Sequence, residues 1–262
     1  GINVSTVLKN LGVDSVALGF VAGFTGKAIE EGVAALGVKA DFITVSDGVS
    51  RINVKLKAGE ETEINGKGPN ISDAELEELY KKLDGLTDGD CLVLAGAIPP
   101  SLPSDVYEKI MARLAGKKVD IVVDATKDLL LNVLKYHPFL IKPNNFELGE
   151  MFGVTLHSDE EIEEYAKKLQ ALGARNVAVS MAGDGSMLIT ENGETYRMGV
   201  PKGKVVNSVG AGDSMVAGFI ASYFAEHDYK KALKYGAATG SATAFSEGLA
   251  TKDQVEKLLG QF

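Results

Sequence analysis

The chain has 262 residues, 45% of them hydrophobic, which is enough to bury the core of one α/β domain or of two small ones. Its formal net charge of −9 argues against a nucleic-acid partner held through phosphate contacts. Because no apolar run reaches membrane-spanning length and no signal peptide opens the chain, we expect no membrane partner and a cytoplasmic location. Cys91 is the single cysteine, which excludes an internal disulfide.

The apolar spacing predicts alternating strands and helices. Residues 2–11 form the first predicted helix, which Gly12 ends. Buried strands are then expected at residues 15–23, 41–45, 91–97, 119–124, 139–142 and 176–182, with helices between them. Capping boxes support two of the helices, at Ser72 with Glu75 and at Ser158 with Glu161. This alternation indicates βαβ units and a mostly parallel sheet covered on both faces.

Two segments alternate apolar and polar residues and are predicted as antiparallel hairpins. One spans residues 51–66 around a turn at Gly59, and the other spans residues 186–199 around Asn192 and Gly193. The first hairpin is inserted early in the domain, where it is either a lid over a site or a surface excursion.

Residues 207–219, NSVGAGDSMVAGF, place Gly210, Ala211 and Gly212 directly before Asp213 and the start of a helical apolar pattern. A helix start offers unpaired N–H groups and partial positive charge, and small residues let an anion approach the backbone. The stretch therefore predicts an anion cradle with a carboxylate beside it. The alternative is ordinary helix capping, in which Asp is also a preferred residue.

Other polar clusters follow predicted strands. Lys142, Asn144 and Glu147 lie at or just after the end of the predicted strand 139–142. Ser180, Gly183 and Gly185 lie at or just after the end of the strand 176–182, and Gly96 lies at the end of the strand 91–97. Ligands of open parallel sheets bind outside the carboxyl ends of the strands, so we expect these loops to meet at one cleft.

In combination, these motifs resemble the ribokinase-like sugar kinases of the phosphofructokinase B branch, from Gly1 to about Glu247. The matching motifs are G-A-G-D at residues 210–213, N-x-x-E at 144–147, P-P-S-L-P at 99–103 and an S-x-G-x-x-G-like run from Ser180 through Gly183 to Gly185 or Ser186. Within the branch, the stretches at residues 23–32, 50–57, 61–72 and 206–214 are most similar to bacterial enzymes that convert fructose 1-phosphate to fructose 1,6-bisphosphate.

The resemblance implies a single kinase domain over residues 1–262: a ribokinase-like three-layer sandwich with a mostly parallel central sheet and a small β-sheet lid near residues 49–66. It implies an ATP-dependent sugar-phosphate kinase that uses Mg²⁺. Tagatose-6-phosphate kinase is the closest alternative activity. A sugar-phosphate-binding protein without turnover is the alternative from another class.

Site roles follow from the same resemblance. Asp213 is the expected base, and the N–H groups of Gly210, Ala211 and Gly212 hold the transferred phosphoryl group. Asn144 and Glu147 position Mg²⁺ through water. The nucleotide is expected at Lys142, Asn144, Ser180, Gly183 and Gly185, and the sugar phosphate at Asn3, Arg51 and Gly96. A homodimer formed through the lid is also expected.

The sequence departs from the family at its start. Members open with a strand that ends in a sugar-binding Asp, further lid strands and a Gly-Gly-Lys-Gly run, of which Gly1 resembles the last residue. We therefore expect the N-terminal strand and part of the lid to be absent from this sequence, and the natural protein to carry them.

Overall fold

The computed structural model describes residues 1–58, 60–96, 98–125 and 127–262, and it is built around a six-stranded sheet. The strand order is β12-β11-β10-β9-β8-β7, in which β7 to β10 are parallel and β11 and β12 are antiparallel. The strands are β7 (Cys91–Ala95), β8 (Asp120–Asp124), β9 (Leu140–Ile141), β10 (Asn176–Ser180), β11 (Ser186–Ile189) and β12 (Thr195–Met198).

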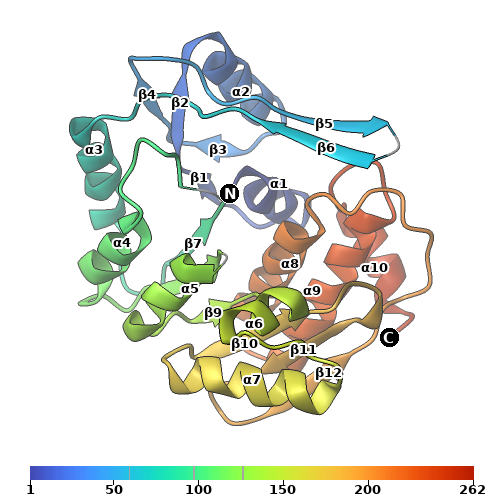
Figure 1. Ribbon diagram of the computed structural model, residues 1–262. Coiled ribbons are helices and arrows are strands. Elements are labelled where there is room, and N and C mark those ends of the chain that lie inside the picture. The colour runs from blue at the N-terminus through green and yellow to red at the C-terminus, as the bar shows by residue number, and fades with distance from the viewer. Residues whose placement is uncertain (59, 97, 126) are drawn as a thin grey trace.

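Helices cover both faces of this sheet, which gives three layers (Figure 1). One layer holds α3 (Asp73–Asp84), α4 (Val106–Leu114), α5 (Lys127–Val133), α6 (Asn145–Phe152) and α7 (Asp159–Ala171). The other holds α1 (Ile2–Asn10), α8 (Ala211–Glu226), α9 (Tyr229–Ala244) and α10 (Lys252–Leu259). Short 3-10 helices lie at Leu134–Tyr136 and Ala182–Asp184.

Alternation along β8 explains why the sheet needs two helical layers. Ile121 and Val123 pack into the core under α3 to α7, while Val122 between them packs into the core under α1 and α8 to α10. Successive side chains of a strand point to opposite faces, so an unbroken apolar run must be buried on both sides.

Helices α8 and α9 pack closely because glycines line their contact. A Cβ atom at Gly236 would lie 2.9 Å from the Met215 carbonyl oxygen, and one at Gly240 would lie 3.0 Å from that of Ala211. The Ser214 hydroxyl also donates to the Gly210 carbonyl at 2.8 Å and lies 2.7 Å from the Thr243 hydroxyl. These contacts fix the N-terminus of α8 against α9.

The N-terminal part of the chain differs from the single sheet that the sequence predicts. In the described part of the chain, β1 (Val16–Ala17) pairs with β3 (Lys39–Ala40), and β2 (Phe20–Ala22) pairs with β4 (Ile43–Val45). Helix α2 (Gly23–Ala35) connects the two pairs. These strands form separate two-stranded sheets. The sequence did not predict this, because apolar spacing indicates which residues are buried and not which strands pair.

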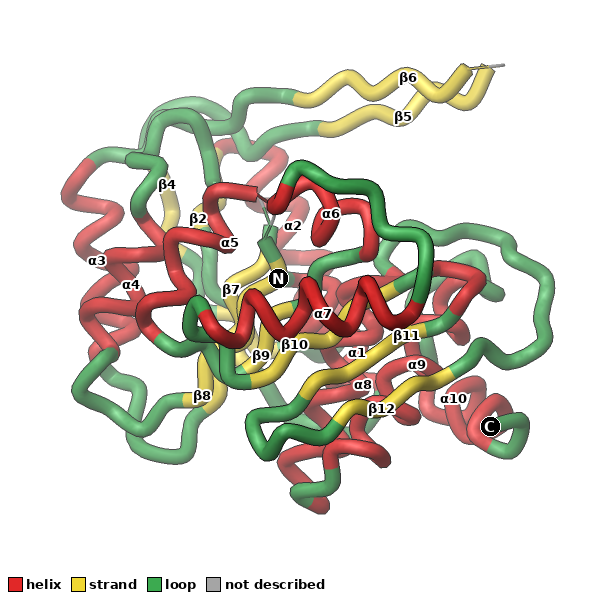
Figure 2. Tube along the Cα trace, turned by 60° about the horizontal axis from the view of Figure 1, so that its bottom comes forward, coloured by secondary structure: helices red, strands yellow, loops and turns green. Residues whose placement is uncertain are grey.

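Both predicted hairpins are confirmed. Strands β11 and β12 form one, and β5 (Asn53–Ala58) and β6 (Glu60–Asn65) form the other, with Val54 opposite Ile64. Figure 2 shows the β5–β6 hairpin projecting from the body of the molecule. The expected turn residue Gly59, and Ala97 at the end of a predicted strand, lie outside the described residues.

Of the two predicted capping boxes, the one at α3 is complete and the one at α7 is half formed. Ser72 and Glu75 exchange both bonds. The Glu161 N–H donates to the Ser158 hydroxyl at 3.2 Å, but the Glu161 carboxylate accepts from the His157 N–H at 2.6 Å instead of from Ser158. The Glu161 carboxylate thus satisfies the N–H of His157, the residue before the N-cap, instead of the N–H of Ser158.

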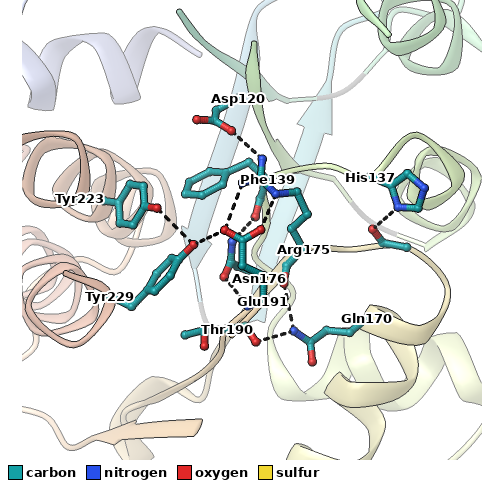
Figure 3. Close-up of polar contacts among 11 residues, drawn as sticks. Asp120, His137, Phe139, Gln170, Arg175, Asn176, Thr190, Glu191, Tyr223 and Tyr229 are labelled. Carbon is teal, nitrogen blue, oxygen red and sulfur yellow. Dashed lines mark hydrogen bonds and ion pairs between the residues drawn. The ribbon is translucent and has the colours of Figure 1, made fainter. Parts of the chain in front are cut away.

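A polar network joins β8, β10, the β11–β12 turn and α9 (Figure 3). Arg175 forms two bonds with Glu191, at 2.6 and 3.1 Å, and one with Asp120 at 2.7 Å. The Tyr229 hydroxyl donates to the same Glu191 carboxylate at 2.6 Å. Hydrogen bonding to Arg175, its largest cause, holds the pKa of Glu191 below its usual range.

Among the described residues, no helix is both long enough and apolar enough to cross a membrane.

Candidate active site

The N-terminus of α8 presents free backbone donors. Gly210 precedes the helix in the left-handed conformation, with φ 82°, which a glycine adopts without strain. The Ala211 N–H donates to the Ser208 carbonyl at 3.1 Å. Within the described ranges, no backbone carbonyl accepts from the N–H groups of Gly212 or Asp213. The free donors of the first turn are therefore those of Gly212 and Asp213 rather than that of Ala211.

Asp213 lies directly beside Asn3, although 210 positions separate them in the sequence. The Asn3 amide donates to Asp213 Oδ2 at 2.8 Å, which fixes the carboxylate and leaves Oδ1 for another hydrogen bond. Asn3 lies on α1, so the contact between α1 and α8 brings a predicted sugar contact to the predicted base.

Lys142 reaches the same point from the end of β9. It is 8% exposed, and its Nζ lies 3.3 Å from Asp124 Oδ1. A Cβ atom at Gly212 would lie 3.1 Å from this Nζ, so the ammonium group borders the N-terminus of α8. The combination of a buried cation and free N–H groups favours an anion at this position.

Asn144 and Glu147 are bonded to each other's backbone. The Asn144 side chain accepts from the Glu147 N–H at 2.8 Å, and Glu147 Oε2 accepts from the Asn144 N–H at 2.8 Å. This capping box starts α6 and was not foreseen for this pair. Among the described residues, no group of three or more His, Cys, Asp or Glu side chains could hold a metal ion.

The oxygen atoms of Asn144 and Glu147 are the kind of donor that a hydrated Mg²⁺ prefers. Mg²⁺ keeps several waters and binds through one or two carboxylates plus substrate phosphates. Glu147 is only partly buried, and Oε1, the oxygen that the cap does not use, can meet such a hydrated ion.

Ser180 lies next to Asn144 because their backbones form an isolated parallel bridge, with the Ser180 N–H donating to the Pro143 carbonyl at 3.0 Å. The two glycines that follow have different roles. A Cβ atom at Gly183 would meet nothing within 4 Å, whereas one at Gly185, with φ 99°, would collide with the Met198 carbonyl. Gly183 is therefore open to a ligand, and Gly185 is required by the β11–β12 hairpin.

Gly96 and Asp124 line a cavity of about 630 Å³, together with apolar residues of the loop that follows Gly96. The Tyr107 hydroxyl donates to the Gly96 carbonyl at 3.1 Å, and burial raises the pKa of this tyrosine to about 12. The cavity lies at the carboxyl ends of β7 and β8, where an open parallel sheet binds its ligands.

Arg51 is exposed and lies two residues before β5, at the base of the projecting hairpin. No hydrogen bond joins it to Asp213, Asn3 or Gly96 in the described part of the chain. The structure thus gathers Asn3, Lys142 and Asp213 at one point, and it leaves Arg51 at the base of the β5–β6 hairpin.

Asp124 is the site residue that the sequence interpretation missed. Burial raises its pKa, the Lys142 ammonium lowers it, and the charge of Asp213 raises it, with a net upward shift. Its position at the carboxyl end of a buried strand was a usable signal, because the same rule identified its neighbours.

A fixed carboxylate, a buried cation and free N–H donors around one point form the arrangement that phosphoryl transfer to a hydroxyl requires. The three-layer fold with this site at its strand ends defines the class as a kinase. The model of the pfkB family of carbohydrate kinases matches residues 1–256, and the chain belongs to this family.

Relatives and solved structures agree with this assignment. The chain is 50% identical to 1-phosphofructokinase of Bacillus subtilis (strain 168), covering 99% of this chain and 85% of the relative. It is 37% identical to D-tagatose-1-phosphate kinase of Bacillus licheniformis, over 100% of this chain and 86% of the relative.

Among solved structures, a phosphofructokinase candidate from Staphylococcus aureus superimposes with a TM-score of 0.90 at 44% identity, over 99% of this chain and 84% of that one. Ribokinase of Arabidopsis thaliana superimposes with a TM-score of 0.79 at 20% identity, over 99% and 86% of the two chains, which shows the shared fold. The ribokinase-like fold is thus confirmed.

Proposed function

We propose that this protein transfers the terminal phosphoryl group of ATP to the C6 hydroxyl of fructose 1-phosphate, forming fructose 1,6-bisphosphate and ADP. The observation that carries the proposal is the contact of Asn3 with Asp213 at 2.8 Å, which leaves Asp213 Oδ1 for the sugar hydroxyl beside the free N–H groups of α8. The relative named 1-phosphofructokinase, at 50% identity, supports this choice of substrate.

In this proposal, Asp213 accepts the proton of the sugar hydroxyl as its oxygen attacks the phosphorus atom. The N–H groups of Gly212 and Asp213 and the Lys142 ammonium face the charge that develops on the phosphoryl oxygens. Asn3 keeps the carboxylate oriented. Gly96 and its cavity, together with Arg51 on the lid, serve the sugar phosphate.

ATP would extend from the N-terminus of α8 toward Asn144, Ser180 and Gly183. Mg²⁺ bound with the nucleotide would offset the charge of the phosphates, and Asn144 and Glu147 would hold it through water. These assignments use the residues that the structure leaves accessible. Gly185 supports this nucleotide site indirectly, by shaping the hairpin beside Gly183.

The alternative sugar is a tagatose phosphate. A relative at 37% identity is named D-tagatose-1-phosphate kinase, so tagatose 1-phosphate is the first alternative, and tagatose 6-phosphate is the one that the sequence predicted. Fructose and tagatose differ only in the configuration at C4. The two 1-phosphates would therefore place the same C6 hydroxyl beside Asp213.

The test is ADP release from ATP and Mg²⁺ with fructose 1-phosphate, tagatose 1-phosphate, tagatose 6-phosphate and fructose 6-phosphate. We expect the highest kcat/KM with fructose 1-phosphate and, by phosphorus NMR, a 1,6-bisphosphate product. A higher kcat/KM with a tagatose phosphate would replace the proposed substrate. Sugar-phosphate binding without ADP release would instead indicate a binding protein.

We also propose a homodimer formed through the β5–β6 hairpin. Ile52, Val54, Leu56 and Ile64 are 58%, 41%, 48% and 56% exposed on this projecting element. A second copy of the same apolar face would cover them.

As an acidic chain without a membrane-spanning helix among its described residues, the enzyme is assigned to the cytoplasm in this proposal.

A further inference from the structure

A second carboxylate, that of Asp124, lies in the site and has no part in the proposed function above. Asp124 is the last residue of β8, at the edge of the sheet where ligands bind. Its side chain is 22% exposed, and it lines the same cavity as Gly96. Its Oδ1 lies 3.3 Å from Lys142 Nζ.

Lys142 lies between Asp124 and the start of α8. The Lys142 side chain is 10% exposed, with Asp124 on one side of its ammonium group and the backbone of Gly212 on another. A lysine carries three donors on a flexible four-carbon stem, so its position must be fixed by its partners. With one donor turned to Asp124, the others can meet phosphate oxygens.

We propose that Asp124 is a positioning residue for phosphoryl transfer, because its carboxylate holds the Lys142 ammonium against the N-terminus of α8. This inference rests on the proposed function, which places the transferred phosphoryl group at Gly212. A charge held in place before the reaction stabilises the transition state more than one that must be reoriented.

Asp124 also keeps the lysine away from the base. The charge of Asp213 acts on Asp124, and the Lys142 ammonium borders Gly212, the residue directly before Asp213. Without Asp124, the ammonium would pair with Asp213, because an unpaired buried cation is costly. Loss of Asp124 would then move the Lys142 ammonium away from the phosphoryl group. It would also pair this ammonium with the Asp213 oxygen that accepts the proton.

A double-mutant cycle with Asp124→Asn and Lys142→Met separates this role from a direct one. We expect D124N to lower kcat by about 10- to 100-fold, the cost of a misplaced catalytic group, with KM for the sugar changed by less than about threefold. Adding D124N to K142M should cost less than about threefold more, because the first change has already removed the group that Asp124 positions. Effects that multiply would overturn the inference, and so would a D124N enzyme with wild-type kcat.

Asp120→Asn is the matched control. It lies on the same strand and pairs with Arg175 at 2.7 Å, at the other end from the cavity. We expect it to lower thermal stability and to leave kcat unchanged. An equal fall of kcat in D120N would make the effect of D124N structural. Should D124N unfold at the assay temperature, Asp124→Glu, which keeps the charge, is expected to retain more activity than Asp124→Ala; equal losses would count against the inference.

Calorimetric binding of a non-hydrolysable ATP analogue with Mg²⁺ repeats the cycle without a sugar. We expect the losses of affinity in D124N and K142M to be non-additive by at least about fivefold. A wild-type protein that turns over no sugar phosphate would refute the proposed function, while this binding cycle would still decide the role of Asp124. Additive losses of affinity would refute the role itself.

Discussion

The Asp213 carboxylate has one oxygen bonded to Asn3, which leaves the other to receive the sugar proton. We expect Asp213→Asn to lower kcat by about 10²- to 10⁴-fold, the usual contribution of a general base, while nucleotide affinity stays near the wild-type value. Steady-state kinetics and calorimetry with ADP measure the two quantities.

Asp253→Asn is the control for Asp213→Asn, because Asp253 is also an acidic residue in the first turn of a helix, exposed at the start of α10. It should leave kcat unchanged. Near-normal turnover in D213N would show that Asp213 serves only to start helix α8. It would also remove the basis of the proposed function.

The two glycines of the run after Ser180 give a second test at the residue scale. Gly185→Ala should destabilise the fold by about 2 kcal/mol or more, because φ is 99° and the new Cβ would collide with the Met198 carbonyl. Gly183→Ala should leave stability within about 0.5 kcal/mol, since its Cβ would meet open space, but should weaken ATP binding severalfold. Urea denaturation and nucleotide titration measure the pair. If G183A binds ATP as the wild type does, the nucleotide lies elsewhere.

How far the sequence predicted these residues depended on how local each signal is. Gly210 to Asp213 are neighbours on one helix start, so their spacing alone predicted an anion cradle. The resemblance to a family gave Asn3 only as a sugar contact, and the hydrogen bond of Asn3 to Asp213, which spans 210 positions, was not predicted. The pairing of Asp124 with Lys142 depends on two adjacent strands ending level, which periodicity does not report.

At the scale of elements, the polar network around Glu191 makes a testable contribution to stability. Hydrogen bonding to Arg175 and Tyr229 lowers the pKa of Glu191 from its ordinary value of 4.5. A lowered folded-state pKa gives stability that is complete above 4.5 and is lost as the pH falls through the folded-state value. Since this carboxylate is partly exposed, we expect about 1 kcal/mol after solvent screening.

The measurement compares Glu191→Gln with the wild type by urea denaturation from neutral pH to about pH 3. The wild type should be more stable at neutral pH, and the two free energies of unfolding should converge as the pH falls below 4.5. Glu30→Gln, an exposed change on α2, should run parallel to the wild type throughout. A constant difference between E191Q and the wild type at every pH would contradict the assignment.

Elements were predicted well where the pattern is local and poorly where partners are distant. Apolar periodicity located α1, both hairpins and the buried strands of the six-stranded sheet. It placed residues 15–23 in one strand, whereas Gly19 separates the short strands β1 and β2. Each of these pairs with a different partner, β3 or β4, and partner choice is a tertiary property.

At the scale of the whole molecule, the projecting hairpin is the feature that a single chain leaves without a packing partner in the described structure. Its apolar residues alternate on one face, with Val54 opposite Ile64 and Leu56 opposite Thr62. Such a face resembles half of a packed interface rather than a solvated surface, and isologous pairing of two copies would bury it.

Leu56→Lys should weaken this dimer, because each copy would then bury an unpaired ammonium in an apolar contact. We expect the dissociation constant to rise at least about tenfold, since burying a polar group without a partner costs about 1–3 kcal/mol. Leu172→Lys is the matched control: Leu172 is 52% exposed, against 48% for Leu56, and it ends α7 away from the hairpin.

Sedimentation analysis should show the wild type and L172K at twice the chain mass of 27.6 kDa, with L56K nearer to a single chain. A wild type that sediments as one chain at micromolar concentration, or an L172K protein that dissociates as readily as L56K, would contradict pairing through the hairpin. Because Arg51 lies at the base of this same hairpin, a loss of the dimer in L56K should also raise KM for the sugar phosphate while leaving kcat within about threefold of the wild type.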